Sequence, residues 1–448
     1  MLLDFVELDT GTGAVYKRLY AAISQAVEKG IIKKGERLPS IREASEFLSV
    51  SRTTVENAYI QLCIEGIAES SPQRGYYILG AGRAERSKTQ GHKSDPRVKY
   101  DLSGRSIDAF SADTDYWRRT VRQVLRDTDA LISYGDPQGE PELRAALAEY
   151  SYKARGVRTK PENIVIGAGI GPLLNILCGL TGRNVTVAME SRFEQAESIF
   201  ADYGIKTVTL ERDRNGARAE GLEKSGADIL FLMPSALSKI SVTGLSARRN
   251  SFLKWASDGK RLVIEDDYNG ELRYTARSVT AFQPKCPEST VYIGSFSKLL
   301  LPSVRIAYMV LPDRLVPELA ARRGVYNQTC GKTEQSALKI YIESGELEKH
   351  LRKLRKLYYA KSRYFCEAAA EIFPEASVTL FESSLTVQLE FKGGFDAAAV
   401  FAAAVKDGIA LSEPADGAKL RLCFAGIREE EIIPALTGLH RCLEISAV

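Results

Sequence analysis

The sequence predicts an α/β protein with a winged helix-turn-helix at its N-terminus, and two patterns support this fold class. Short amphipathic helices followed by a strand, a turn and a second strand fill residues 1–79. Between residues 163 and 293, apolar strand-like runs are separated by stretches of helix length. That alternation is typical of a mainly parallel sheet whose ligand binds at the carboxyl ends of the strands.

Length and composition limit the possibilities. A chain of 448 residues is too long for one core, so two or three domains are expected. The net charge of +4 neither indicates nor excludes nucleic acid as a partner. The seven cysteines form no C-x-x-C pair, which favours reduced thiols in a cytoplasmic protein over a disulfide framework or a zinc site. No run of about 18 apolar residues occurs, so no membrane segment is expected.

The N-terminal helices have recognisable starts. Ser40, followed three residues later by Glu43, forms a capping box that opens a second helix, and Ser51 is the expected N-cap of a third. The inner face of the third helix is expected to consist of apolar side chains at helical spacing, namely Val55, Ala58, Tyr59 and Leu62.

The third helix has the features of a DNA recognition helix. Such a helix carries short polar and cationic residues at its N-terminal end, where they reach base edges and phosphates. The candidate DNA-binding residues from this pattern are Arg42, Arg52, Thr53 and Thr54, with Arg74 and Gly75 at the tip of the wing. The alternative is a small helical module that binds protein. Charge does not favour DNA, because residues 1–80 hold nine basic and ten acidic side chains.

Residues 80–100 are predicted to be a flexible linker. They lack apolar periodicity, and Gly80, Gly82, Gly91 and Pro96 interrupt any helix. The basic excess of this segment allows contact with the DNA backbone, although a purely solvated tether explains it equally well.

Lys298 is the central candidate for chemistry. It lies just past the end of an apolar run, 291–293, where the backbone holds the residue while its amine faces the crevice beyond the strand. This placement suits a lysine that forms a Schiff base with an aldehyde cofactor. The alternative is an ordinary solvated surface lysine.

A second strand, 262–265, ends in Asp266, Asp267 and Tyr268. Pyridoxal 5′-phosphate (PLP) needs a carboxylate that keeps its pyridine nitrogen protonated, a role for Asp266, and Tyr268 can donate to the ring oxygen. The alternatives are a solvated loop and a divalent metal site. No metal is predicted, because none of the three histidines lies nearby in the sequence.

A glycine-rich turn, 167–172, follows the first strand of the predicted sheet. Small residues at the start of a helix let backbone N–H groups approach a phosphate. The alternative is an ordinary tight turn, which a glycine-rich stretch alone also fits. In combination with Lys298 and Asp266, the turn predicts a phosphate cradle at Ile170 and Gly171, to which Arg305 can add a guanidinium.

Together these motifs resemble the fold-type-I aminotransferases, and most closely the aminotransferase half of the MocR (GabR-like) regulators. Residues 38–42 and 50–55 likewise resemble the GntR winged helix, in which Ser51 and its neighbours contact operator DNA. The resemblance implies a large PLP-binding domain over 101–330 and a smaller α+β domain over 331–448. It also implies a homodimer in which Tyr134 reaches the neighbouring subunit's cofactor.

The same resemblance assigns Arg421 to the substrate carboxylate, which the planar guanidinium can grip. Two departures from the family pattern stand out. Phe193 replaces the tyrosine that covers the pyridine ring, so stacking is kept but a phenol hydrogen bond is lost. Ala236 and Leu237 replace a His-Gln pair near the ring oxygen, which puts transamination in question.

The resulting hypothesis is a PLP-dependent transcriptional regulator that binds double-stranded operator DNA and senses PLP or a small amino compound. One alternative is a working PLP-dependent aminotransferase with an appended DNA-binding module. Another is a regulator that senses PLP itself. The sequence leaves open the effector, the operator and the direction of regulation.

Overall fold

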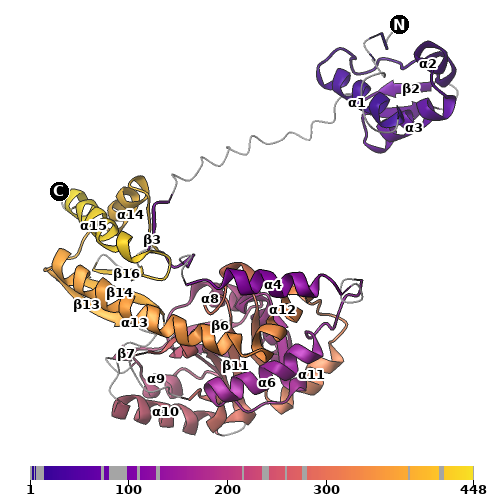
Figure 1. Ribbon diagram of the computed structural model, residues 1–448. Coiled ribbons are helices and arrows are strands. Elements are labelled where there is room, and N and C mark those ends of the chain that lie inside the picture. The colour runs from indigo at the N-terminus through magenta and orange to yellow at the C-terminus, as the bar shows by residue number, and fades with distance from the viewer. Residues whose placement is uncertain are drawn as a thin grey trace. The chain divides into compact units, whose positions relative to one another are not determined.

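The computed structural model describes residues 3–4, 6, 15–71, 75–79, 98–107, 111–127, 132–213, 216–234, 242–257, 260–274, 280–381, 384–412 and 418–446. The chain forms two compact units, Met1–Asp95 and Pro96–Val448 (Figure 1). Most of the predicted linker, residues 80–97, lies outside the described residues.

The first unit is a winged helix-turn-helix, as predicted. Its elements are α1 (Val15–Glu28), α2 (Ile41–Leu48), α3 (Arg52–Ile64), β1 (Ala68–Ser71) and β2 (Gly75–Ile78). The predicted capping box is present, because Ser40 Oγ accepts from the backbone N–H of Glu43 and the Glu43 carboxylate accepts from that of Ser40. Ser51 caps α3 by accepting the N–H of Thr54 at 3.1 Å. These bonds satisfy helix N–H groups that would otherwise lack a partner.

The predicted inner face of α3 forms the core of this unit. Val55, Ala58, Tyr59 and Leu62 are each fully buried. The ring of Tyr59 also meets the ring of Tyr76 edge to face at 5.0 Å, so the antiparallel wing packs directly on α3.

The second unit contains a seven-stranded sheet in the order β4-β12-β11-β10-β9-β5-β6. Its strands are β4 (Ile164–Gly167), β5 (Thr186–Met189), β6 (Lys206–Thr209), β9 (Ile229–Leu232), β10 (Leu262–Asp266), β11 (Thr290–Ser295) and β12 (Ala307–Val310). All neighbours are parallel except β12, which is antiparallel to both β11 and β4. The predicted mainly parallel sheet is therefore confirmed, but the sequence did not reveal β12 or the polar edge strand β6.

Helices cover both faces of this sheet. They are α4 (Thr114–Val124), α6 (Pro141–Arg155), α7 (Ile170–Thr181), α8 (Glu194–Asp202), α9 (Ala219–Lys224), α10 (Val242–Ala256), α11 (Val316–Ala321) and α12 (Lys332–Glu343), with a small β7 (Arg212–Asp213) and β8 (Gly216–Ala217) hairpin. On β11, Val291 and Ile293 pack in the cluster that contains residues of α7 and α8, whereas Tyr292 packs in the cluster that contains residues of α6 and α12. Burial on both faces explains why the parallel strands read as continuous apolar runs.

The last third of the chain builds a smaller subdomain. Its elements are α13 (Glu346–Ile372), β13 (Ala376–Phe381), β14 (Thr386–Phe391), α14 (Ala397–Lys406), β15 (Ile409–Ala410), β16 (Lys419–Cys423) and α15 (Ile432–Ser446). The three longer strands form an antiparallel sheet in the order β13-β14-β16. Figure 1 shows α13 running from the large sheet subdomain to this smaller one.

The segment that leads into the second unit joins the small subdomain. Here β3 (Tyr100–Asp101) pairs in parallel with β15, matching Tyr100 to Ile409. Tyr100, predicted in the linker, and Asp101, predicted in the large domain, therefore pair with β15 of the small subdomain.

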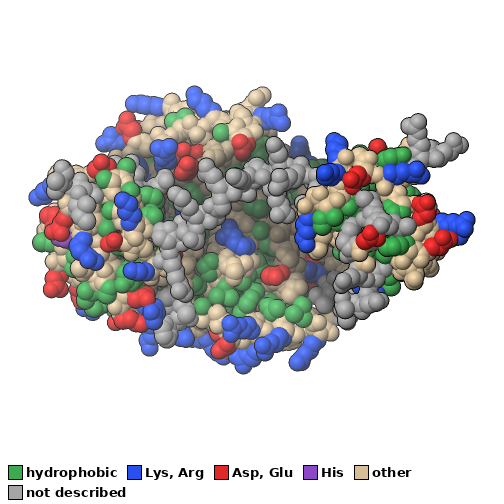
Figure 2. Space-filling model, turned by 90° about the horizontal axis from the view of Figure 1, so that it is seen from above, with side chains coloured by type: hydrophobic (Ala, Val, Ile, Leu, Met, Phe, Trp, Pro, Cys, Tyr) green, Lys and Arg blue, Asp and Glu red, His purple; other side chains and the backbone are tan. Residues whose placement is uncertain are grey.

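Charged side chains of both signs are spread over the face seen in Figure 2. Within the described ranges, no helix is long and apolar enough to cross a membrane. The same residues contain no group of His, Cys, Asp and Glu side chains that could hold a metal ion.

Candidate functional site

The predicted site lies at the carboxyl ends of two adjacent parallel strands. Asp266 ends β10, where it is in register with Ile293 of β11. Lys298 follows the end of β11 at Ser295. Because these strands are neighbours, their carboxyl ends lie at one edge of the sheet. Asp266 and Lys298 are both positioned at that edge.

Three segments that are distant in sequence meet at the Lys298 amine. Its Nζ lies 3.7 Å from Cys423 Sγ at the end of β16. Gly104, at φ +79°, lies against both residues, and a Cβ there would be 3.2 Å from Lys298 Nζ and 3.1 Å from Cys423 Sγ. The large subdomain, the small subdomain and the leading segment thus each contribute one wall around the amine.

Asp266 is a buried carboxylate at this edge. It is 4% exposed, and within the described part of the chain its side chain has no hydrogen bond or ion pair. Burial, with a smaller contribution from Asp267, raises the pKa of Asp266 to about 8. A buried carboxylate in this situation becomes stable as an anion only when a cation is placed beside it.

Asp267 has a different role that the sequence did not reveal. Its Oδ2 accepts from Arg155 Nε at 2.6 Å, and both side chains are at most 2% exposed. Tyr292 donates to the same oxygen at 3.2 Å. Asp267 is therefore paired within the protein, and Asp266 is left to face the site.

Tyr268 and Arg421 lie at the same place from two subdomains. Burial raises the pKa of Tyr268, with further contributions from Asp266 and Cys423, while the Arg421 guanidinium opposes the shift. Arg421 donates from Nε to Gln388 Oε1 at 3.3 Å and lies over the ring of Phe381 at 5.5 Å. The predicted carboxylate-binding arginine is thus held by the small subdomain, within electrostatic reach of Tyr268.

The predicted phosphate cradle is at the start of α7. Gly169 precedes the helix at φ +92°, and Ile170 and Gly171 form its first turn. The Arg305 guanidinium lies so close that a Cβ on Gly169 would be 2.7 Å from Arg305 Nη2. Arg305 Nη1 is also 3.4 Å from Ser297 Oγ. Unpaired N–H groups at a helix start beside a guanidinium form an anion-binding arrangement.

Phe193 is the N-cap residue of α8 and lies 6.2 Å, ring to ring, from Phe231 at the centre of β9. It packs against the same apolar cluster as Leu262 and Ile264, which share a strand face with Asp266. The predicted stacking residue therefore belongs to the Asp266 side of the sheet. Ala236 and Leu237 lie outside the described residues.

The residues at this edge fit PLP. A lysine amine, a buried carboxylate without a cation and an arginine beside a helix start are the three donor types that PLP requires for its aldehyde, pyridine nitrogen and phosphate. Gly104 and Gly169 have no Cβ, so their backbones can lie close to the Lys298 amine and to the Arg305 guanidinium, respectively. The orphaned Asp266 is the most informative member, because a pyridinium would supply the cation it lacks.

Tyr134 does not meet these residues in the described chain. Its side chain is 103% exposed, which is the full exposure of a free tyrosine. Ile132, two residues earlier, is 76% exposed. The place of Tyr134 at a dimer interface therefore stays a prediction.

The candidate DNA interface is the N-terminal end of α3. Arg52 and Thr53 are exposed there, and Thr54 shares a 2.8 Å hydrogen bond with Ser51. Arg42 is 74% exposed and forms an i,i+4 ion pair with Glu46 at 2.9 Å. Solvent weakens this exposed pair, so a DNA phosphate could replace Glu46 as the partner of Arg42.

Arg37, which no sequence pattern singled out, lies against the wing. Gly75 has φ +99°, and the Arg37 guanidinium packs against it, with Nε 3.2 Å from the position of a Cβ. The backbone of Arg37 forms an isolated antiparallel β-bridge with Tyr77 of β2. Arg74 lies outside the described residues. No local pattern pointed to Arg37, because its approach to the wing depends on how the hairpin folds back.

Two families match the chain in tandem. The family described as bacterial regulatory proteins, gntR family, matches residues 15–78. The family described as aminotransferase class I and II matches residues 109–439.

Three regulators are similar to the chain, and the first matches nearly all of it. The uncharacterized HTH-type transcriptional regulator YdeL of Bacillus subtilis is 31% identical over 449 residues, covering 96% of this chain and 97% of its own. The HTH-type pyridoxine biosynthesis transcriptional regulator PdxR of Corynebacterium glutamicum is 28% identical and covers 76% of each chain. The probable rhizopine catabolism regulatory protein MocR of Rhizobium meliloti is 28% identical, covering 78% of this chain and 76% of its own.

Solved aminotransferases share the fold of the second unit. An archaeal alanine:glyoxylate aminotransferase matches with a TM-score of 0.70 at 20% identity, covering 77% of this chain and 91% of its own. The α-aminoadipate aminotransferase of Thermus thermophilus, solved with N-(5′-phosphopyridoxyl)-L-leucine, matches with a TM-score of 0.68 at 22% identity, covering 78% of this chain and 92% of its own. At these identities the likeness establishes the fold.

Proposed function

The chain belongs to the MocR-type regulators of the GntR family, and from that membership we propose that its aminotransferase-like domain binds PLP and an amino compound to control operator binding. The relatives are HTH-type transcriptional regulators, and the gntR-type domain is the DNA-binding part. Binding of PLP, the nature of the effector and the coupling between the units form the proposal. A role at operator DNA would place the protein in the cytoplasm.

The observation that carries the proposal is the buried carboxyl of Asp266, which has no cation paired with it in the described chain and lies at the sheet edge where Lys298 follows β11. A carboxylate that is buried without a cation is costly in a protein that never binds a cationic ligand there. When bound, PLP supplies an aldehyde that condenses reversibly with amines and a protonated ring that withdraws electrons. Asp266, the Lys298 amine and the α7 cradle together give this ligand three points of attachment.

In this proposal each residue has one role toward the ligand. Lys298 forms the covalent link, Asp266 holds the proton on the pyridine nitrogen, and Tyr268 donates a hydrogen bond to the ring oxygen. Ile170, Gly171 and Arg305 bind the phosphate, and Phe193 stacks on the ring. Arg421 binds the carboxylate of an incoming amino compound, while its Nε–H donates to Gln388 Oε1.

A homodimer completes the proposal. The full exposure of Tyr134 supports a role at an interface, and a two-fold dimer would present two winged helices to two operator half-sites. A change in how the two subdomains close on a ligand would alter the presentation of those helices, which is the coupling that regulation requires.

Specific observations favour two alternatives. Similarity to a pyridoxine biosynthesis regulator favours PLP itself as the signal. The intact set of Lys298, Asp266 and Arg421 favours an aminotransferase that turns over an amino donor, whereas Phe193 in place of a tyrosine disfavours it.

The test combines spectroscopy with DNA binding on the full-length protein. PLP linked to a lysine absorbs at roughly 420 nm, so the wild type should show this band and Lys298→Ala should lack it. Lys406→Ala, an exposed lysine at the end of α14, is the matched control and should keep the band. Duplexes selected from a random pool then report operator binding, which Arg52→Ala should weaken.

The outcomes separate the alternatives. A band that shifts with certain amines, together with a change in DNA binding, supports the proposal. DNA binding that responds to PLP alone identifies PLP as the signal, and repeated turnover of an amino donor and a keto acid identifies an enzyme. Absence of the band in the wild type at saturating PLP overturns the proposal for the cofactor.

A further inference from the structure

The backbone of Arg37 is held against the wing. Residues 35–38 form three hydrogen bonds with β2, from Gly35 N to Ile78 O at 2.7 Å, from Ile78 N to Glu36 O at 2.9 Å and from Leu38 N to Tyr76 O at 2.9 Å. Arg37 is thereby paired with Tyr77 in an antiparallel bridge. The segment before α2 therefore adds a short third strand to the wing, and this strand fixes the position of Arg37.

The side chain of Arg37 lies on the outer face of this small sheet. Directly opposite residues of antiparallel strands point to the same side, so Arg37 shares a face with Tyr77, which is paired in turn with Glu69 of β1. The next residues along, Leu38 and Ile78, point the other way and are each 1% exposed. Arg37 is itself exposed, away from the core of the unit.

The Arg37 guanidinium covers Gly75 at the start of β2. Its Nε, Nη2 and Cζ atoms lie 3.2, 3.4 and 3.7 Å from the position that a Cβ of Gly75 would occupy. Gly75 is two residues from Tyr77 and therefore on the same strand face. A side chain at position 75 would occupy the space that the guanidinium fills.

This packing positions the guanidinium without neutralising it. Among the described residues Arg37 forms no ion pair, whereas Arg42 is paired with Glu46 at 2.9 Å. Hydrogen bonds with Ser40 lower the pKa of the Glu43 carboxyl, and the Arg37 charge adds a smaller effect, so Arg37 lies within electrostatic reach of the start of α2. A charge that is already positioned loses little side-chain entropy when it binds an anion.

The place of Arg37 suits contact with the DNA backbone. In a helix-turn-helix the first helix, here α2, crosses that backbone, while the second, here α3, enters the major groove. Arg37 lies between the start of α2 and the wing. A guanidinium that lies along the protein surface reaches a phosphate more readily than a base edge, and its fork of N–H groups matches phosphate oxygens.

We propose that Arg37 binds a phosphate of the operator backbone beside the wing, and that Gly75 is the residue that makes room for it. This inference rests on the proposed operator binding. It adds a contact that positions the wing on the duplex but does not read its sequence.

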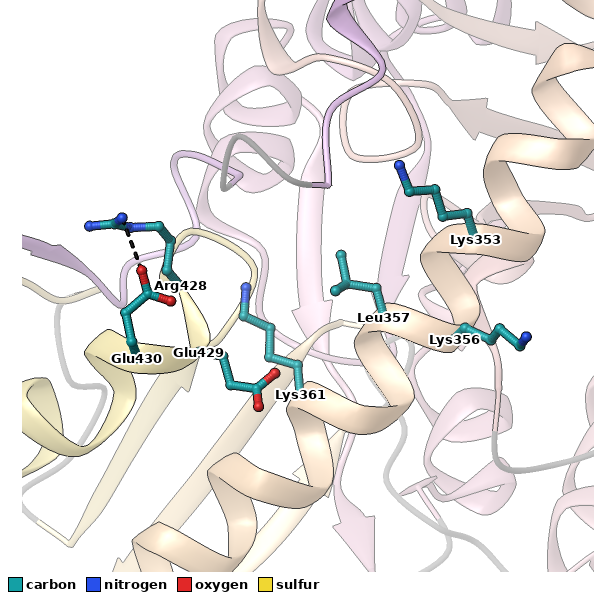
Figure 3. Close-up of a pocket in the computed structure, with 7 residues that line it drawn as sticks. All are labelled: Lys353, Lys356, Leu357, Lys361, Arg428, Glu429 and Glu430. Carbon is teal, nitrogen blue, oxygen red and sulfur yellow. Dashed lines mark ion pairs between the residues drawn. The ribbon is translucent and has the colours of Figure 1, made fainter.

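A basic surface in the other unit supplies a control. Lys353 and Lys356 of α13 line a cavity of about 530 Å³ with Leu357, Lys361 and, from a separate segment, residues 428–430 (Figure 3). Figure 3 shows these side chains, with Arg428 paired to Glu430. Lys353 and Lys356 are exposed. If charge alone attracted the duplex, the loss of one of them would weaken binding as much as the loss of Arg37.

The test is DNA binding by the full-length protein as a function of salt, on a duplex that the wild type selects from a random pool. Each phosphate contact contributes about 0.9 to the slope of log Kd against log salt concentration. Arg37→Ala should therefore lower this slope by about 0.9 for each winged helix on the duplex, and should raise Kd about fivefold for each at about 0.15 M salt. Arg37→Lys keeps the charge and should retain most of the slope.

Lys17→Ala and Lys356→Ala are the matched controls. Each removes one exposed positive charge, from α1 and from α13 respectively. Both variants should keep the slope and the Kd of the wild type.

Gly75→Ala tests the support of the guanidinium. The added methyl would lie 3.2 Å from Arg37 Nε, so it should displace the guanidinium and lower the slope as Arg37→Ala does. Gly66→Ala is its control, because Gly66 has φ +70°, comparable to φ +99° at Gly75, but open space at its Cβ position. Gly66→Ala should keep the wild-type slope. If Gly75→Ala does not fold, the exposed Arg37→Ala carries the test.

Selection from the random pool should return the same consensus for Arg37→Ala as for the wild type, because a phosphate contact carries no sequence information. A changed consensus would assign Arg37 to base reading and overturn the phosphate role. The proposal also fails if Arg37→Ala keeps the wild-type slope, or if the lysine controls lose as much of it. A wild type that selects no duplex would overturn the proposed operator binding, and this contact with it.

Discussion

The ionisation of Asp266 should change the free energy of unfolding by a measurable amount. In the folded, cofactor-free protein burial raises its pKa to about 8, whereas the unfolded carboxyl ionises near its ordinary value of 3.8. Between these values the unfolded chain has released a proton that the folded chain still holds. The raised pKa therefore costs stability progressively as the pH rises from about 4 to about 8.

The prediction is that Asp266→Asn stabilises the cofactor-free protein. Its gain over the wild type should be absent near pH 4 and should reach at least about 1 kcal/mol at pH 8. Denaturant unfolding at several pH values measures it, with Asp202→Asn, an exposed aspartate of α8, as the control. The same variant should bind PLP more weakly, since the ring nitrogen loses its carboxylate. A stability gain that does not depend on pH would show that it does not come from the ionisation of Asp266.

Arg155 and Asp267 form the buried ion pair beneath the site. Both are at most 2% exposed, so removal of one partner leaves an uncompensated buried charge. We expect Arg155→Met to destabilise the second unit by about 3–5 kcal/mol, because such a charge is poorly solvated.

Unfolding of Arg155→Met and of the double variant Arg155→Met/Asp267→Asn measures this pair. The double variant should recover part of the loss, since neither charge then remains. Arg158→Met, an exposed arginine three residues later, should stay close to the wild type. Equal losses in Arg155→Met and Arg158→Met would show that the pair contributes little.

At the scale of elements, α7 begins and ends with glycines at positive φ, and only one end faces the proposed ligand. Gly169 has φ +92° and lies against Arg305, whereas Gly182 has φ +83° and open space around its Cβ position. The two positions share the backbone strain of an alanine substitution, about 1–3 kcal/mol, but differ in what the added methyl meets.

Gly169→Ala should therefore weaken PLP binding strongly, because the methyl displaces the Arg305 guanidinium from the cradle. Gly182→Ala should lose comparable stability and keep the PLP affinity of the wild type. Absorbance titration with PLP compares the two. Equal PLP affinities in both variants would remove the start of α7 from the proposed cradle.

At the scale of the whole molecule, the two units have separate cores. The apolar cluster of the winged helix contains only residues of the first unit, and the clusters of the second unit contain none of them. Each unit should therefore unfold in its own transition.

Calorimetry should show two transitions that respond differently to PLP. At a PLP concentration of about 100 times the dissociation constant, the larger unit should gain about 2.7 kcal/mol while the winged helix stays unchanged. In Lys298→Ala the gain should shrink. If both transitions rise together, the units are coupled more tightly than their cores indicate.

Local features of this protein could be predicted from sequence. Ser40 and Ser51 cap helices through side-chain bonds to residues three positions away, and the buried face of α3 follows from helical periodicity. Lys298 and Asp266 could be placed at one sheet edge because both follow apolar strands and parallel strands present their carboxyl ends together. In each case the cause lies within a few residues or in a repeating pattern.

Only the tertiary structure brought together residues from distant segments. Gly104 and Cys423 meet at the Lys298 amine, Arg155 pairs with Asp267 across 112 positions, and β12 enters the sheet antiparallel. The cavity along α13 also needs Arg428 from a separate segment. Such contacts depend on how whole elements pack against one another, and no periodicity or cap within one segment encodes which distant side chain will lie opposite it.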